Sequence, residues 1–246
     1  MVNNYYFEIA LQSALTHYEQ IKNVMKRILL MVLLLSLSNG IMAQQTVVNG
    51  NIVGQEDGQL IFGSLHNGEY RKDTVEVVDG KFTWKVDLTE PQKIGVMFPS
   101  RYFQFFAGSK EEISIIGSAD SISTLRVSGS KVQDEADLHK TSLQDLTDKE
   151  MALYKQWGKV SDEEQKGLEK TIRELRSERR QRGIEYVAKN PDSYFSLDLV
   201  NDDALMGSYE EVAPSFKLLS NRMQNSANGI RLAERLEIIK RSSLGE

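Results

Sequence analysis

The pattern of apolar residues changes once along this chain, near Gly129, and this change restricts the fold more than any other feature. Between Thr46 and Gly129, short segments rich in Val, Ile, Phe, Tyr and Thr alternate with Gly, Asp, Asn or Ser, which is typical of strands and turns. After Gly129 the segments are long and charged, which is typical of helices. We therefore expect an α+β protein with an N-terminal antiparallel β-sandwich followed by an α-helical region.

The first part contains segments that are each expected to form one short strand. Their regular spacing, without helices between them, favours an antiparallel sandwich or barrel over a parallel sheet. Asp79-Gly80 predicts a tight hairpin turn, because both residues tolerate a positive φ angle. The expected strands are Thr46–Val53, Gln59–Leu65, Asp73–Val78, Lys81–Val86, Lys93–Phe98, Tyr102–Ala107, Glu112–Ile116 and Ser123–Ser128.

The second part predicts two long helices, Asp134–Trp157 and Asp162–Lys189. Ser161 and Glu164 have the spacing of a capping box, which satisfies free amide groups at a helix start. Asn190-Pro191 is expected to end the second helix and to begin the next, with Asn190 as its cap. Shorter helices are expected over Ser193–Asn201, Tyr209–Ser220 and Gly229–Arg241.

An apolar run close to the N-terminus predicts export. Lys26-Arg27 precede the run Ile28–Leu35, and small residues follow up to Ala43, as in a secretory signal. The run is short for a membrane span, which needs roughly 20 apolar residues. We expect cleavage between Ala43 and Gln44, a periplasmic location and no stable membrane anchor after cleavage.

The start of the leader leaves an alternative open. Residues 1–43 are interpreted as leader and signal peptide, with Met25 as the true initiator. If translation starts at Met1 instead, the longer n-region favours an uncleaved signal anchor. Gln44 stands where a lipoprotein would need Cys, so lipid attachment is not expected.

Composition removes several classes of site. The chain has no Cys among its 246 residues, which excludes disulfides, thiolate catalysis, Cys-bound zinc and iron–sulfur clusters. It has three His, of which His17 lies in the leader, so a three-His metal site is excluded. The net charge of −5 argues against a nucleic-acid partner. With no catalytic motif visible, we predict no enzyme activity, no catalytic, cofactor-binding or metal-binding residue, and no cofactor.

Two groups of polar residues are interpreted as ordinary protein surface rather than as sites. The arginines between Arg173 and Arg182 are interleaved with Glu174, Glu178 and Glu185, which predicts a solvated, neutralised helix face. Acidic pairs could supply a general acid and base, but acidic residues beside helix N-termini are favoured without catalysis. These pairs are Asp202-Asp203 and Glu210-Glu211, and the remaining candidates, His66 and His139, are isolated.

The aromatic run Tyr102–Phe106, together with Trp84, could form a platform that stacks on sugars. In a strand, Phe103 and Phe105 fall on one face, and Tyr102, Gln104 and Phe106 on the other. Aromatic residues in strands usually fill the core, so core packing is expected to explain at least half of this run.

A series of short motifs, each occurring once, extends in a fixed order along nearly all of the mature chain. They are Gly50-Asn51-Ile52, Gly58-Gln59-Leu60, Asp73–Val77, Asp79–Phe82, Glu90-Pro91, Phe103–Gly108, Val127–Ser130, Gln133–Glu135, Tyr186-Val187, Asn190–Leu197 and Leu232–Leu236. In this order and spacing the chain resembles a bacterial domain of unknown function of the DUF4369 type. That domain precedes the thioredoxin-like domain of exported TlpA-like, AhpC/TSA thiol:disulfide oxidoreductases.

The resemblance implies an accessory role. In such relatives the segment similar to Ser242–Glu246 leads into a thioredoxin fold with a Trp-Cys-x-x-Cys site. This sequence stops at Glu246 without any Cys, so no catalytic residue of the family carries over, because disulfide exchange requires a thiolate.

We therefore expect a non-catalytic, exported accessory or binding module whose partner is an envelope protein or a small ligand. Two alternatives stay open: a truncated oxidoreductase that has lost its catalytic domain, and a glycan-binding β-sandwich. The expected domain boundaries are 1–43 for leader and signal, 44–130 for the sandwich and 131–246 for the helical region.

Overall fold

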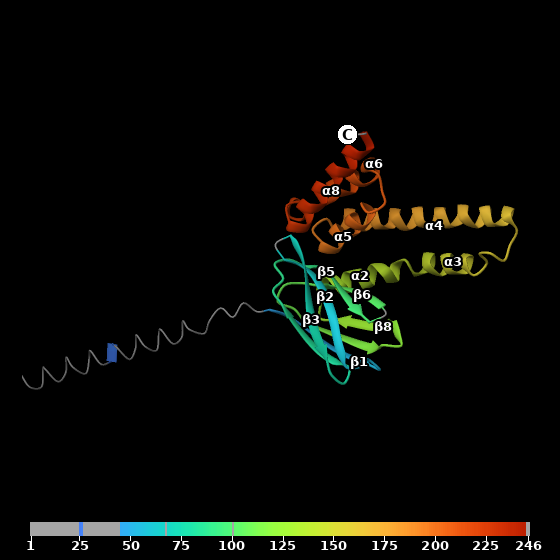
Figure 1. Ribbon diagram of the computed structural model, residues 1–246. Coiled ribbons are helices and arrows are strands. Elements are labelled where there is room, and N and C mark those ends of the chain that lie inside the picture. Colours follow the sequence, from blue (N-terminus) through green and yellow to red (C-terminus); the bar gives the residue numbers. More distant parts are fainter. Residues whose placement is uncertain (1–24, 27–44, 67, 100, 245–246) are drawn as a thin grey trace, which may run out of the picture. The chain divides into compact units, whose positions relative to one another are not determined.

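The computed structural model describes residues 25–26, 45–66, 68–99 and 101–244 (Figure 1). Gln45–Glu246 form one compact unit. The predicted leader, signal peptide and cleavage point lie outside the described residues, except for Met25 and Lys26. Among the described residues, no helix has both the length and the apolar character needed to span a membrane.

Two four-stranded sheets form the first part of this unit. Sheet A has the order β4-β1-β7-β8, and sheet B has the order β3-β2-β5-β6. The predicted sandwich-like α+β arrangement is confirmed, with one exception to its antiparallel pairing: β1 and β7 run parallel. The strands are β1 Thr46–Val53, β2 Gly58–His66, β3 Glu69–Val77, β4 Lys81–Val86, β5 Gln92–Phe98, β6 Arg101–Ala107, β7 Glu112–Ser118 and β8 Ser121–Ser128.

Alternating apolar residues from both sheets fill the core between them. In β4, Phe82, Trp84 and Val86 are buried while the residues between them are exposed. The Trp84 ring stacks on Phe62 of β2 at 4.7 Å between ring centroids. The core therefore joins sheet A to sheet B through aromatic contacts as well as aliphatic ones.

The predicted Asp79-Gly80 turn is confirmed. Both residues have positive φ angles, 52° and 71°, and the backbones of Val78 and Lys81 exchange two hydrogen bonds. The hairpin does not extend beyond this one pair, because β3 continues into sheet B and β4 into sheet A. This turn thus carries the chain from one sheet to the other.

Helices make up the second part of the unit. The long helix α4 matches its predicted bounds, and Ser161 and Glu164 form the predicted capping box. Within the described ranges these helices are α2 Lys131–Ser142, α3 Gln144–Tyr154, α4 Asp162–Lys189, α5 Tyr194–Asp203, α6 Tyr209–Leu218, α7 Asn221–Gln224 and α8 Ala227–Leu244.

The single helix predicted over Asp134–Trp157 is wrong, because Leu143 separates α2 from α3. Its ψ angle of 5° lies outside the helical range, and the Ser142 hydroxyl donates to the carbonyl of His139 at 2.6 Å. A side chain that bonds the local backbone competes with the helical pattern. The break lets Leu143 and Leu146 pack together against Leu175 of α4.

The predicted cap at Asn190 is also wrong. Asn190 caps the C-terminus of α4, and Ser193 caps α5 by accepting from the backbone N–H groups of Phe195 and Ser196. Serine is as good an N-cap as asparagine, and here it stands directly before the helix.

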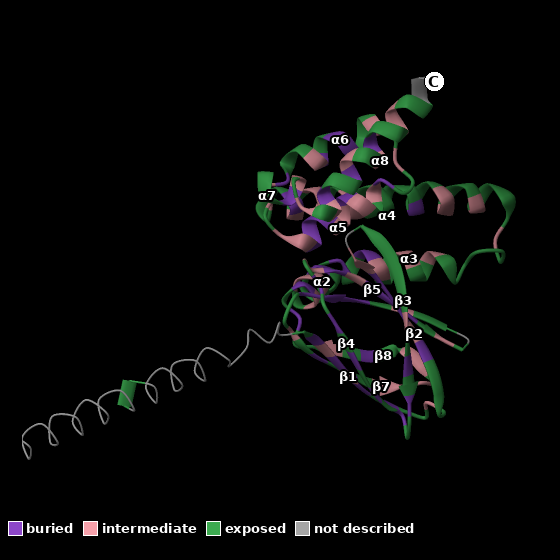
Figure 2. Cartoon of the chain, turned by 60° about the vertical axis from the view of Figure 1, so that its left-hand side comes forward, coloured by how far each residue is buried: buried purple, intermediate pink, exposed green. Residues whose placement is uncertain are grey.

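A separate apolar cluster joins the helices to sheet B. Phe106 of β6 packs edge-on against Phe195 of α5 at 5.7 Å between ring centroids, and Val132 of α2 completes the cluster. Phe106 points to the face of sheet B opposite the core, since Phe105 beside it lies in the core. Figure 2 shows buried residues both in the sandwich and among the helices.

Candidate functional site

A cleft lies between the outer face of sheet B and the helices α5 and α8. Its volume is about 940 Å³, which is within the range of pockets that hold small ligands. We call it the sheet–helix cleft. Its charged and amide-bearing lining residues include Lys93 and Gln104 from the sheet, Asp198 and Asp202 from α5, and Arg231 and Arg235 from α8.

Lys93 occupies the floor of this cleft. Its ammonium group lies 2.7 Å from a carboxylate oxygen of Asp198 and 3.0 Å from one of Asp202. Residues four apart lie on the same face of a helix, so one turn of α5 presents both acids to the lysine. The ammonium also lies 5.5 Å from the centroid of the Phe106 ring. The charge of Lys93 is therefore fully matched by protein groups.

Burial and neighbouring charges shift the pKa values of Asp198 and Lys93. Burial, together with the charge of Asp202, raises the pKa of Asp198 to about 6 despite the contact with Lys93. Burial lowers the pKa of Lys93, but Asp198 and Asp202 outweigh it and leave the pKa above its ordinary value. Asp198 consequently keeps its proton to a higher pH than an ordinary aspartate does, because its pKa is raised.

Two arginines four residues apart approach the cleft from α8. The Nη1 atom of Arg235 is buried and has no hydrogen-bond partner among the described residues. Arg231 donates from its Nη1 to the carbonyl of Gly68 at 3.3 Å, a long hydrogen bond. Buried polar atoms are nearly always satisfied, so the Nη1 of Arg235 is an exception, as is the Nη2 of Arg180 on α4.

The position of α8 depends on the loop before β5. The carboxylate of Glu90 accepts the backbone N–H groups of Ala227 at 3.0 Å and Asn228 at 2.8 Å. These are free donors at the first turn of a helix, and a negative charge there is favourable. Nearby, the Gln92 side chain accepts from the Leu65 N–H at 2.6 Å and donates to the Leu65 carbonyl at 2.9 Å. Glu90 thereby fixes the start of α8, and Gln92 joins β5 to β2 within sheet B.

The arginine cluster of α4 is not the simple solvated face that was predicted. Its charges are neutralised, but largely by acids of other helices: Arg176 and Arg179 both bond Glu150 of α3, and Arg182 bonds Asp145. Of the three glutamates expected to neutralise the cluster, Glu178 bonds Arg182. The cluster thus holds α3 against α4.

Two of the acidic residues meet across another arginine. Arg180 lies 3.5 Å from Asp203 and 3.5 Å from Glu211. Both acidic pairs lie beside helix ends, as expected: Asp202 and Asp203 end α5, and Glu210 and Glu211 lie in the first turn of α6. Glu211 forms a capping box with Ser208.

The proposed role of Trp84 in sugar stacking is wrong. Trp84 is buried in the core, and its ring N–H donates to Asp73 at 2.9 Å. Phe105 lies in the core as predicted, and Phe103 packs against it. Tyr102, in contrast, is 54% exposed.

The two histidines outside the leader lie apart from each other. His66 contacts the hydroxyl of Ser64 at 3.1 Å. His139 is buried beside the rings of Tyr186 and Phe195, and burial lowers its pKa. In the part of the chain that the structure describes, no cluster of three or more His, Cys, Asp or Glu side chains could hold a metal ion.

The sequence did not reveal the cleft residues. Lys93, Asp198 and Arg235 are single charges on three separate elements, and no local spacing links them. The one local signal is the four-residue spacing of Asp198 and Asp202 beside an apolar helix face.

The strands of the two sheets and the start of α2 have a known counterpart. Residues 46–136 match the family model described as Domain of unknown function (DUF4369). The match ends inside α2, at the cluster that joins the helices to sheet B, and so does not reach α5 or α8. No curated protein and no solved structure matches the chain.

Proposed function

We propose that this chain is an exported, non-catalytic binding module of the periplasm, related to the accessory region that precedes thioredoxin-like domains, and that the sheet–helix cleft is its binding site. The DUF4369 match supports the relation for residues 46–136. The signal-like segment before Ala43 supports export. Thiol–disulfide exchange needs a thiolate, which no residue of this sequence supplies.

The observation that carries the proposal is the buried Nη1 of Arg235 without an acceptor. An unsatisfied buried donor costs about 1–3 kcal/mol, and Arg235 lines the cleft, so a ligand that draws its guanidinium toward the cleft and supplies the missing acceptor would recover this cost. Lys93 does not compete for that acceptor, because Asp198 and Asp202 already match its charge. The ligand accordingly carries a carboxylate, phosphate or carbonyl group that faces α8.

The test begins with the full chain, expressed with its own leader in a Gram-negative host and purified from the periplasm. N-terminal sequencing should find Gln44 first if the cleavage prediction is correct. Native mass spectrometry should detect a bound small molecule or peptide that adds mass to the protein. Recovery of the protein only from the cytoplasm, or an N-terminus at Met1, would remove the support for export.

A matched pair of variants assigns the ligand to the cleft. Arg235→Gln should reduce the fraction of liganded protein about tenfold, since it removes one charge-assisted hydrogen bond. Arg241→Gln, at an exposed position of the same helix, should leave that fraction unchanged. Equal ligand retention by both variants, or no ligand on the wild type, would overturn the cleft as the binding site.

A further inference from the structure

The outer face of sheet B contains a pair of glycines at its centre. Gly63 of β2 and Gly95 of β5 are direct partners in the antiparallel pairing of these two strands. In the same row, Lys72 of β3 stands opposite Gly63, and Gln104 of β6 stands opposite Gly95. The middle of this face therefore has no side chains of its own and is bounded by a lysine and a glutamine.

One tyrosine from each edge strand covers one of these glycines. A Cβ atom added to Gly63 would collide with the hydroxyl end of Tyr70, and one added to Gly95 would collide with that of Tyr102. Tyr70 pairs with Leu65, so it reaches Gly63 diagonally. Tyr102 pairs with Met97 and reaches Gly95 diagonally from the other end of the sheet. Because the two glycines are direct partners, the two hydroxyl groups converge on the centre of the face.

The tyrosines cover glycine backbone and yet remain open to solvent. Tyr70 is 59% exposed and Tyr102 is 54% exposed. Packing over a glycine explains why each ring lies along the sheet, a known device for stabilising strands. It does not explain why two large aromatic side chains on one face are left uncovered, while Phe106 on the same face is buried under α5.

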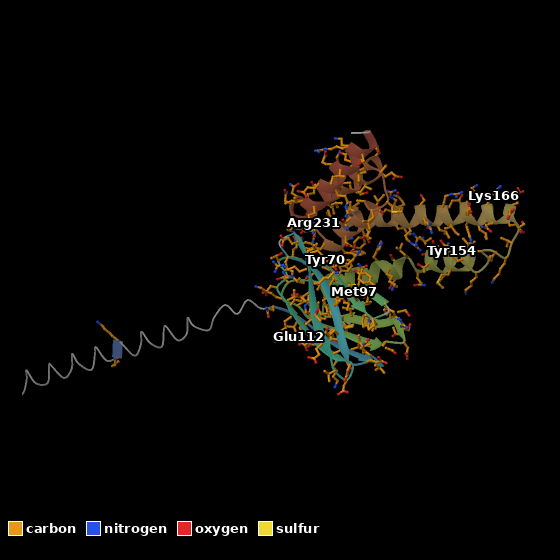
Figure 3. The ribbon with its side chains drawn as sticks, viewed as in Figure 1. Tyr70, Met97, Glu112, Tyr154, Lys166 and Arg231 are labelled. Carbon is orange, nitrogen blue, oxygen red and sulfur yellow. The ribbon has the colours of Figure 1, made fainter. Side chains whose placement is uncertain are left out.

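This aromatic surface is continuous with the sheet–helix cleft. Gln104 lines the cleft, and its side-chain amide donates to the Tyr102 hydroxyl at 3.0 Å. Arg231, another lining residue of the cleft, bonds the carbonyl of Gly68, two residues before Tyr70. Figure 3 places Tyr70 and Met97 on the sheet and Arg231 on the helix above it.

We propose that Tyr70 and Tyr102 form a binding platform for the pyranose rings of a polysaccharide. The apolar C–H face of a pyranose packs against an aromatic ring, and the hydroxyl groups at its edge bond polar side chains. The rings of Tyr70 and Tyr102 supply the flat surface, and their hydroxyl groups, Lys72 and Gln104 supply donors and acceptors. This proposal specifies a ligand class for the surface that includes the cleft, and in that respect it rests on the proposed function.

The arrangement favours a sugar chain over an extended peptide. Peptides that bind sheets add to a free edge through main-chain hydrogen bonds. Gly63 and Gly95 lie on the two central strands, whose backbones are already paired on both sides. Peptide side chains also need pockets, whereas Tyr70 and Tyr102 line none of the main cavities. A flat aromatic surface over strands whose backbone hydrogen bonds are already made suits the ring of a sugar.

The probes are neutral soluble polysaccharides (xylan, mannan and a mixed-linkage glucan), used in affinity gel electrophoresis with the full chain. At least one should retard the wild type. Tyr70→Ala and Tyr102→Ala should each weaken the retardation about tenfold, and the double variant should abolish it. Tyr70→Phe and Tyr102→Phe keep the ring and should weaken it less than alanine does. Trp157→Ala, at an exposed aromatic residue in another part of the chain, is the control and should have no effect.

The outcomes separate this proposal from the cleft proposal. Retardation that survives the double tyrosine variant, or no retardation by any probe, overturns the platform. The same holds if an arrayed peptide library binds at Tyr70 and Tyr102 while the polysaccharides do not. A thermal melt of each variant identifies any that fails to fold. If an alanine variant does not fold, the effect of Tyr70→Phe and Tyr102→Phe on the retardation is used instead. Arg235→Gln should leave the retardation by neutral sugars unchanged, so either proposal can fail alone.

Discussion

The ammonium of Lys93 lies 2.7 Å from the carboxylate of Asp198, and this contact joins a central strand of sheet B to helix α5. Both side chains are largely shielded from water, with 24% and 14% of their surfaces exposed. A charge at this depth is tolerated because it has its partner. The ion pair therefore maintains the floor of the cleft and the attachment of the helical layer together.

Lys93→Met should destabilise the protein more than an ordinary surface change. It leaves Asp198 buried with Asp202 beside it and removes the cation that contacts both, which should lower the free energy of unfolding by about 2–4 kcal/mol at pH 7. Lys72→Met, on the exposed part of the same sheet face, should change it by about 0.5 kcal/mol or less. Urea unfolding measures both, and equal small effects would show that the ion pair contributes no stability.

The raised pKa of Asp198 leads to a second prediction, about how the stability of the fold depends on pH. Its folded-state pKa of about 6 lies above the ordinary value of 3.8. Between these two pH values the folded protein binds the proton more tightly than the unfolded chain does. This group therefore stabilises the fold as pH falls from about 6 towards 4, and that contribution is lost as pH rises again.

Asp198→Asn should remove this contribution. The difference in unfolding free energy between wild type and variant should change with pH between 4 and 7 and be flat below 4. His139 acts in the opposite direction, because burial lowers its pKa and acid must charge it, but this effect is common to both proteins. A constant difference across the whole pH range would contradict the raised pKa of Asp198.

The contact between α3 and α4 supplies a third prediction. Glu150 has a side chain only 13% exposed, and it bonds Arg179 at 2.9 Å as well as Arg176. Glu150→Gln should cost about 1–2 kcal/mol in unfolding free energy, since a hydrogen bond to a charged group is lost. Glu174→Gln is the matched control: its side chain is 64% exposed and lies 3.9 Å from Lys170. Similar stability of the two variants would assign Glu150 no role in holding the helices together.

Local rules predicted much of this fold. The bounds of β1, β4 and α4 follow from alternation, turn residues and a capping box, which all act within a few residues. The break at Leu143 was missed because Ser142 also suits a helix interior, and the contact with Leu175 that the break permits lies some thirty residues later. Local propensity cannot register such a contact.

The candidate site was the least predictable part, for the same reason. Lys93, Asp198 and Arg235 converge only when α5 and α8 lie on sheet B. Tyr70 gave no signal, because its relation to Gly63 depends on strand register. Tyr102 was noticed only within an aromatic run, whose three phenylalanines are buried or half-buried.

The start of α8 gives the last prediction. Glu90 accepts two backbone N–H groups of this helix, from Ala227 and Asn228, across a large separation in sequence. Glu90→Gln removes the negative charge and one of these acceptors, so the unfolding free energy should fall by about 1 kcal/mol. Hydrogen exchange should quicken in the first turn of α8 and remain unchanged in the strands. Glu56→Gln, at an exposed loop position, should alter neither. If the amides of Ala227 and Asn228 exchange at the wild-type rate in Glu90→Gln, the loop before β5 does not determine where α8 begins.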